Sequence, residues 1–173
     1  MGYNSNWGTP AEELIAIHHA LGGIDLDPCS TQEDNRRVKA KYWFGRYDSS
    51  LTKSWGPGSV YCNPPGLVVP AFWKKMMLSR HEFTHGIFAL FNLEGIRTLQ
   101  GMNVPSPMQF PFCVPKSRTR WLDPEVPDGE DPRTRPMHGN AFVYVPGTHG
   151  DIRRFMLAFE RLGECICPEQ ASV

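Results

Sequence analysis

One apolar segment limits the folds open to this chain. Residues 86–93 are apolar almost throughout, which is typical of a strand buried on both faces of a parallel sheet. Such a strand needs a helical layer on each side. Helices are predicted at residues 10–21, at 70–80 and after Thr148, each with apolar side chains at helical spacing. The alternation of strands and helices predicts an α/β fold with a mostly parallel sheet flanked by helices.

The remaining elements are shorter. Strands are predicted at residues 23–26, 60–62, 108–114 and 141–145, and a further helix at 94–101. Residues 30–41 are compatible with either helix or loop. The first helix is expected to begin with Thr9 as its N-cap, Pro10 at its first position and Glu12 closing a capping box.

Length and composition are those of one folded domain. The 173 residues are expected to form a single domain, residues 1–173. Residues 115–139 hold five of the sixteen prolines and many charges, so they are interpreted as one long functional loop or flap. No apolar run approaches the roughly 18 residues of a membrane span.

The cysteines and the amino terminus indicate an intracellular protein. The first residues have neither a basic nor an apolar region of the kind that directs export, and five cysteines fit reduced thiols better than disulfides. We therefore expect a cytoplasmic protein. Cys165 and Cys167 form the only close pair and have no second pair at ligand spacing, so no metal site is expected.

A rigid motif follows the strand predicted at residues 60–62. In Asn63-Pro64-Pro65, the two prolines fix φ, remove two backbone donors and bias Asn63 away from helical conformation. The Asn63 side-chain oxygen and the Pro64 carbonyl could then each accept one hydrogen of an amino group. This arrangement suits methyl transfer to an amine. The same residue types also form ordinary surface turns.

Charge gives no global case for a nucleic-acid partner, because the formal net charge is zero. Residues 36–53 are locally different, with six cations against one acid, Asp48, and aromatic residues between them. This mixture suits contact with phosphates and stacked bases, or equally a solvated face with its aromatics turned into the core.

Taken together, several motifs make the chain resemble the phage-type DNA N6-adenine methyltransferases from Trp7 to about Val145. The matching pieces are Trp7-Gly8-Thr9-Pro10, Ile24-Asp25-Leu26-Asp27-Pro28-Cys29, Asn35, Tyr42-Trp43-Phe44, Asp48-Ser49-Ser50-Leu51, Trp55, Tyr61-Cys62-Asn63-Pro64-Pro65, Trp73, Ser117-Arg118-Thr119-Arg120-Trp121 and the strand at 141–145. The order and spacing of the first seven are fairly specific, whereas the later ones are loose.

The resemblance implies a compact Rossmann-like methyltransferase fold, S-adenosylmethionine as methyl donor and DNA as partner, in the host cytoplasm if the gene is a phage's. It implies that Asn63, Pro64 and Pro65 are catalytic. The cofactor would be bound by Trp7, Thr9, Pro10, Asp27, Pro28, Cys29 and Asp48. Contacts to DNA are expected from Trp43, Arg118, Arg120 and Trp121.

One residue departs from the family. After the second proline the family usually has an aromatic that stacks on the target base, whereas this chain has Gly66. Trp43 or Trp121 is expected to supply the ring instead. Two alternatives stay open: methylation of another amide or amine acceptor, and a non-catalytic module that binds nucleic acid or protein and has kept the fold.

Overall fold

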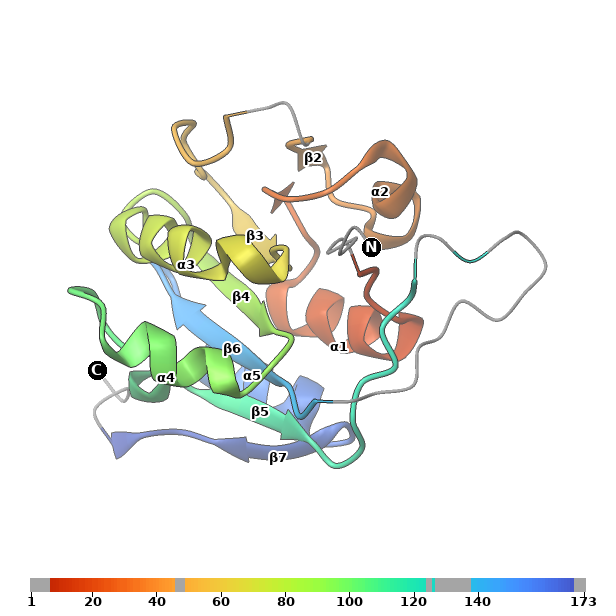
Figure 1. Cartoon of the computed structure of the whole chain (residues 1–173), viewed down its shortest axis with the longest axis vertical. Coiled ribbons are helices and arrows are strands. Elements are labelled where there is room, and N and C mark those ends of the chain that lie inside the picture. Colours follow the sequence, from red (N-terminus) through yellow and green to blue (C-terminus); the bar gives the residue numbers. More distant parts are fainter. Residues whose placement is uncertain (1–6, 46–48, 124–125, 127–137, 170–173) are drawn as a thin grey trace.

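The computed structural model describes residues 7–45, 49–123, 126 and 138–169 (Figure 1). Its helices are α1 (Ala11–Leu21), α2 (Gln32–Val38), α3 (Val69–Leu78), α4 (Glu94–Gln100) and α5 (Ile152–Phe159), with short 3-10 helices η1 (Gly66–Val68) and η2 (Pro107–Gln109). Its strands are β1 (Leu26–Asp27), β2 (Tyr42–Trp43), β3 (Ser59–Cys62), β4 (His85–Leu90), β5 (Phe112–Pro115), β6 (Ala141–Pro146) and β7 (Gly163–Ile166).

The strands form one sheet in the order β2-β1-β3-β4-β6-β5-β7. The pairings among β2, β1, β3 and β4 are parallel. Those of β6 with β4, of β6 with β5 and of β5 with β7 are antiparallel. The α/β class is confirmed, but the sheet is mixed, and the prediction of a mostly parallel sheet is wrong. An apolar run such as β4 indicates that the strand is buried on both faces. It does not indicate whether the neighbouring strands run parallel or antiparallel to it.

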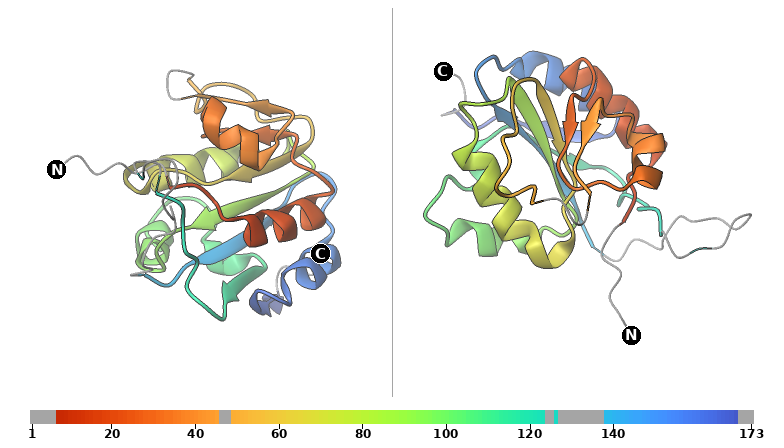
Figure 2. Two further views of the ribbon diagram at one scale, coloured as in Figure 1. Left: turned by 90° about the vertical axis from the view of Figure 1, so that its right-hand side faces the viewer. Right: turned by 90° about the horizontal axis from the view of Figure 1, so that it is seen from above.

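Helices cover both faces of the sheet (Figures 1 and 2). Alternate residues of β6 point into two separate cores: Phe142 and Tyr144 pack with residues of α1 and α5, whereas Val143 and Val145 pack with residues of α3 and α4. This alternation is the period of a strand. The three layers leave the carboxyl ends of β1, β3 and β4 at one edge of the parallel half of the sheet.

The first helix starts differently from the prediction. Pro10 is the N-cap of α1 and no side chain caps the helix, so the predicted capping box of Thr9 and Glu12 is wrong. The Thr9 hydroxyl is instead 2.6 Å from the Tyr61 hydroxyl. At the other end, Gly22 has φ of 71°, a left-handed conformation that glycine adopts without steric penalty.

The structure also decides the segments that the sequence left open. Residues 32–38 form α2, where the Thr31 side chain accepts a hydrogen bond from the Asp34 backbone N–H. β2 and β7 were not predicted. Most of the loop predicted at residues 115–139 lies outside the described residues. None of the described helices is long and apolar enough to cross a membrane.

Candidate active site

The strand order reverses between β1 and β3, since β2 flanks β1 on one side and β3 flanks it on the other. Ligands of open α/β sheets bind at such a reversal, beyond the carboxyl ends of the strands. Asp27 ends β1 and Asn63 follows β3, and both line one small pocket at this edge. The two strand ends touch, because the Cys29 and Cys62 sulfurs are 3.6 Å apart.

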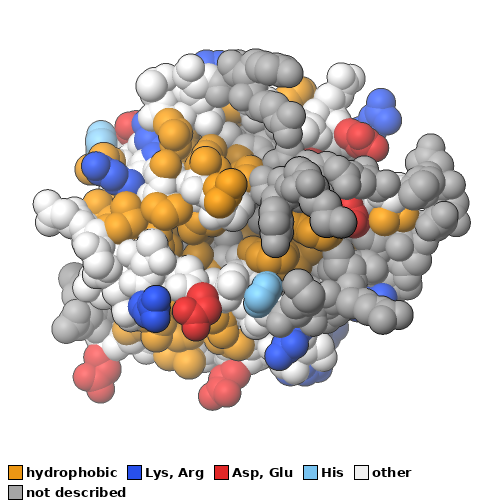
Figure 3. Space-filling model, in the orientation of Figure 1, with side chains coloured by type: hydrophobic (Ala, Val, Ile, Leu, Met, Phe, Trp, Pro, Cys, Tyr) orange, Lys and Arg blue, Asp and Glu red, His pale blue; other side chains and the backbone are white. Residues whose placement is uncertain are grey.

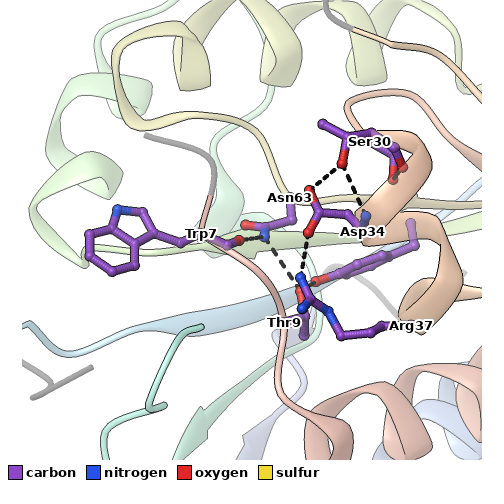
Figure 4. A network of polar contacts seen from close by, with 8 residues as sticks. Trp7, Thr9, Ser30, Asp34, Arg37 and Asn63 are labelled. Atoms are coloured by element: carbon purple, nitrogen blue, oxygen red, sulfur yellow. Dashed lines mark hydrogen bonds and ion pairs between the residues drawn. The ribbon is translucent and has the colours of Figure 1, made fainter. Parts of the chain in front are cut away.

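The Asn63 side chain is oriented by the segment that precedes α1 (Figure 4). Its amide nitrogen donates to the Trp7 backbone carbonyl at 2.8 Å and to the Thr9 hydroxyl at 3.4 Å. A backbone carbonyl only accepts, so the nitrogen must face Trp7 and the oxygen must point elsewhere. Among the described residues, nothing donates a hydrogen bond to the Asn63 side-chain oxygen or to the Pro64 carbonyl. Asn63 lines the pocket, whereas Pro64 is buried and is not among the residues that line it.

Residues 7–9 are held to the site by other contacts as well. Gly8 forms an antiparallel bridge with Leu122 through two backbone hydrogen bonds of 2.8 Å. On its other side a Cβ at Gly8 would lie 2.7 Å from the end of the flexible Arg37 side chain, which would have to shift to make room for it. Arg37 in turn forms an ion pair of 2.5 Å with Asp34. Residues 7–9 thus lie across the mouth of the pocket.

The pocket is nearly closed in this conformation. Its volume is about 20 Å³, enough for one water molecule, whereas drug-sized ligands occupy cavities of about 300 Å³ or more. The polar groups present fit the methionine end of S-adenosylmethionine: a buried carboxylate at Asp27 for an ammonium group, with amide and hydroxyl groups around it. The space does not fit the whole molecule unless residues 7–9 move outward.

Asp27 is the most perturbed acid at this edge. It is 4% exposed, and its burial raises the pKa of the carboxyl group to about 7. Hydrogen bonds from the Cys29 backbone N–H and the Ser30 hydroxyl oppose this effect of burial. An ammonium group beside Asp27 would favour the ionised form, so this carboxylate is prepared for a cationic ligand.

Two of the predicted cofactor residues that the structure describes, Pro10 and Pro28, do not line the pocket. Pro10 lies outside it as the N-cap of α1, and Asp48 lies outside the described residues. Trp7, Thr9 and Cys29 line it together with Asp27. Pro28 fixes the turn between Asp27 and Cys29 without lining the pocket.

The four residues predicted to contact DNA are spread over the molecule. Trp43 is half-buried on β2, directly beside Asp27 in the sheet. Trp121 is 3% exposed and packs on Phe91 and Phe142, so its ring presents no open face for a base. Arg118 and Arg120 are exposed, but they line a different pocket, at the start of α1.

Phe91 is a residue that sequence reasoning missed. It directly follows β4, the strand beside β3, and its half-buried ring stacks on that of Trp7 with centroids 6.1 Å apart. It therefore lies on the Asn63 side of the sheet edge. The apolar run predicted as a strand to residue 93 hid it, because an aromatic inside such a run is indistinguishable from core.

The described residues contain no group of three or more His, Cys, Asp or Glu side chains placed to hold a metal ion. Comparison of the chain with models of known protein families gives no match, and comparison with curated proteins gives none either.

Proposed function

We propose that this protein transfers a methyl group from S-adenosylmethionine to N6 of adenine in DNA, on a compact Rossmann-like methyltransferase fold. One observation carries the proposal. Asn63, whose side-chain oxygen has no donor among the described residues, lines the same pocket as the buried carboxylate of Asp27, at the point where the strand order reverses. Acceptors for an amino group and an acid for the cofactor's ammonium are what amine methylation needs at one place.

The residues of the chain act by binding and orientation. The Asn63 oxygen and the Pro64 carbonyl accept the two hydrogens of the target amino group and direct its lone pair. Asp27 would hold the cofactor's ammonium, with Trp7, Thr9 and Cys29 around it. When bound, S-adenosylmethionine supplies the electrophilic methyl group. The hydrogen bond from Asn63 to Trp7 links the acceptor side of the site to the segment that must open.

The target adenine would have to leave the duplex, which costs a few kcal/mol of stacking and pairing. Trp43, Arg118 and Arg120 remain candidates for contacts to the DNA outside the pocket. Gly66 favours a second candidate function, methylation of another amide or amine acceptor, because an exposed glycine after the second proline offers no ring to a base.

The test is incubation of the purified protein with methyl-labelled S-adenosylmethionine and adenine-containing DNA, followed by digestion to nucleosides. Label is expected in N6-methyldeoxyadenosine. Asn63→Ala should lower the rate by roughly 10²–10³-fold, as for loss of a hydrogen-bonding group that acts in the transition state. Its affinity for S-adenosylmethionine, measured by calorimetry, should change little. Asn103→Ala, at an exposed asparagine, is the matched control.

Asp27→Asn provides the complementary variant. It should weaken S-adenosylmethionine binding by about 1.5–3 kcal/mol through loss of a charged hydrogen bond. If calorimetry of the wild-type protein with millimolar S-adenosylmethionine shows no heat of binding, both proposed methyltransferase functions are contradicted. Binding without label in any nucleoside would leave the amide or amine acceptor as the better candidate.

A further inference from the structure

A second, larger pocket lies beside the first turn of α1. Its volume is about 520 Å³, and it is enclosed by the start of α1, by residues 115–120 and by the chain that follows α5. In Figure 1, the teal segment after β5 passes this end of α1. The same segment continues to Leu122, which pairs with Gly8 next to the candidate active site. The two pockets are therefore lined by successive parts of the chain, residues 7–9 in the first and residues 10–13 in the second.

Glu13 lines this pocket and has an unsatisfied acceptor. The side chain is 8% exposed, and among the described residues its Oε2 is the one buried side-chain nitrogen or oxygen without a hydrogen-bond partner. The Thr119 hydroxyl hydrogen-bonds to this carboxyl group and accepts from the Asn140 amide at 2.9 Å. The carboxyl group is thus positioned by a buried network that satisfies one of its oxygens and leaves the other without a donor.

Four cations and a second acid, the exposed Glu12, line the pocket together with Glu13. Lys116, Arg118, Arg120 and Arg161 line the same pocket, and all four are exposed at its rim. A ligand that suits this arrangement brings a hydrogen-bond donor for the buried oxygen and negative charge for the rim. A nucleotide with an amino-bearing base has both, because the amino group donates and the phosphates accept from Lys and Arg.

We infer that this pocket binds a nucleotide of the DNA substrate, with Glu13 accepting a hydrogen bond from the exocyclic amino group of its base. Cytosine fits best, since a carboxylate accepts well from its N4 amino group, whereas thymine has no amino group and holds its single N3–H between two carbonyl oxygens that repel a carboxylate. The inference rests on the proposal that the protein acts on DNA. It adds a determinant of sequence preference beside the methylated base.

The test is a binding measurement without S-adenosylmethionine, so it does not depend on methyl transfer. Fluorescence anisotropy with single-stranded dC10 and dT10 at pH 7.5 and low salt should show roughly tenfold or stronger preference of the wild-type protein for dC10. Glu13→Leu should abolish the preference and leave binding to dT10 unchanged or stronger. Glu13→Gln, which keeps an acceptor, should retain a preference for dC10.

Arg161→Gln is the matched variant for the rim. It should weaken binding to dC10 and dT10 alike and reduce the salt dependence of both affinities, because a phosphate contact carries no base information. Thermal melting checks the fold, and Glu13→Leu should melt close to the wild-type temperature, because it removes a buried oxygen without a donor but also the carboxyl group to which Thr119 hydrogen-bonds.

Equal affinity of the wild-type protein for dC10 and dT10, or a preference that survives in Glu13→Leu, would overturn the inference. If the protein prefers dC10 through Glu13 and yet methylates no DNA, that result supports the nucleotide-binding pocket and contradicts the proposed methyltransferase function.

Discussion

Burial gives Asp27 an acid–base behaviour different from that of an aspartate side chain in water. Burial raises its pKa from 3.8 to about 7, so the folded protein keeps this proton where the unfolded chain has already lost it. The folded state therefore binds the extra proton between about pH 4 and 7. The protonated Asp27 side chain therefore makes its whole contribution to the free energy of unfolding below about pH 4. This contribution is lost as the pH rises to about 7.

Asp27→Asn should remove this pH dependence. We expect the variant to melt close to the wild-type temperature at pH 4, and to be more stable at pH 8 by roughly 2–4 kcal/mol. That corresponds to about 5–15 °C for a chain of this size. Melting curves between pH 4 and 8 measure it, with Glu33→Gln at an exposed position of α2 as the control. If the melting temperatures of the wild-type protein and of Asp27→Asn change with pH in the same way, the raised pKa of the buried Asp27 is contradicted.

Gly66 is a glycine that its surroundings do not require. A Cβ at this position meets nothing within 4 Å, whereas one at Gly56 would collide with the Glu82 backbone carbonyl. Gly66→Tyr should therefore change the free energy of unfolding by less than about 0.5 kcal/mol, and Gly56→Ala should destabilise the protein by several times more. Urea denaturation compares them.

The same variant tests the acceptor. If the target is adenine, Gly66→Tyr should raise DNA methylation, because the new ring can stack on the base. A stable Gly66→Tyr protein that has lost all activity would indicate a pocket not built for a stacked base.

At the scale of elements, the order of the strands separates the two sides of the site. β2 and β1 lie on the Asp27 side, whereas β4 lies on the Asn63 side. Trp43, on β2, is thus separated from Asn63 by β1. Phe91 follows β4, the strand paired with β3, and its ring stacks on that of Trp7. The aromatic partner of a bound base should therefore come from the end of β4.

Phe91→Ala should lower the rate or DNA affinity by roughly ten- to a hundredfold, the effect of losing one base–aromatic stack. Trp43→Ala, at a half-buried aromatic two strands away from Asn63, should have a much smaller effect. Methylation kinetics on one oligonucleotide compare the two variants. The reverse ranking would restore Trp43 as the stacking residue.

Elements with their own periodic pattern could be predicted from the sequence, and elements that depend on a neighbour could not. α1, α3 and β4 carry enough apolar residues at one spacing to be recognised alone. β2 has two residues, carries no pattern of its own and was not predicted; it is held by its pairing with β1. β1 was predicted at residues 23–26 and forms at Leu26–Asp27, paired with both β2 and β3. The C-terminal helix was predicted to begin after Thr148, but Asp151 caps it, because both residue types suit an N-cap.

The site divides in the same way. Asp27 and Asn63 could be placed together because each follows a predicted strand. Trp7 and Thr9 were expected at the site only through the family resemblance, and Phe91 was missed. All three reach the site through contacts between distant segments, which no local pattern indicates. The long loop misled most: Trp121 was expected on a mobile flap, yet its ring is core, since Leu122 next to it is bridged to Gly8.

At the scale of the whole molecule, α1 and α5 stabilise one face of the sheet together. Phe155 of α5 is fully buried, with its ring 5.1 Å from that of Tyr144 and 4.7 Å from that of Phe159. Phe155→Ala should lower the free energy of unfolding by about 3–5 kcal/mol, because it leaves a cavity in this core. Leu157→Ala, on the same helix but 58% exposed, should cost less than about 1 kcal/mol. Equal losses in urea denaturation would show that α5 is not part of the cooperative core.

The place of β6 in the middle of the sheet has a consequence for synthesis on the ribosome. β6 is made from residues 141–146, yet it supplies the partner of β4, which is complete by residue 90. A nascent chain therefore carries one apolar strand with an unpaired edge while some fifty further residues are translated. Unpaired apolar edges recruit other chains. Ribosomes that stall between these two strands should release products that chaperones must retain or proteases remove.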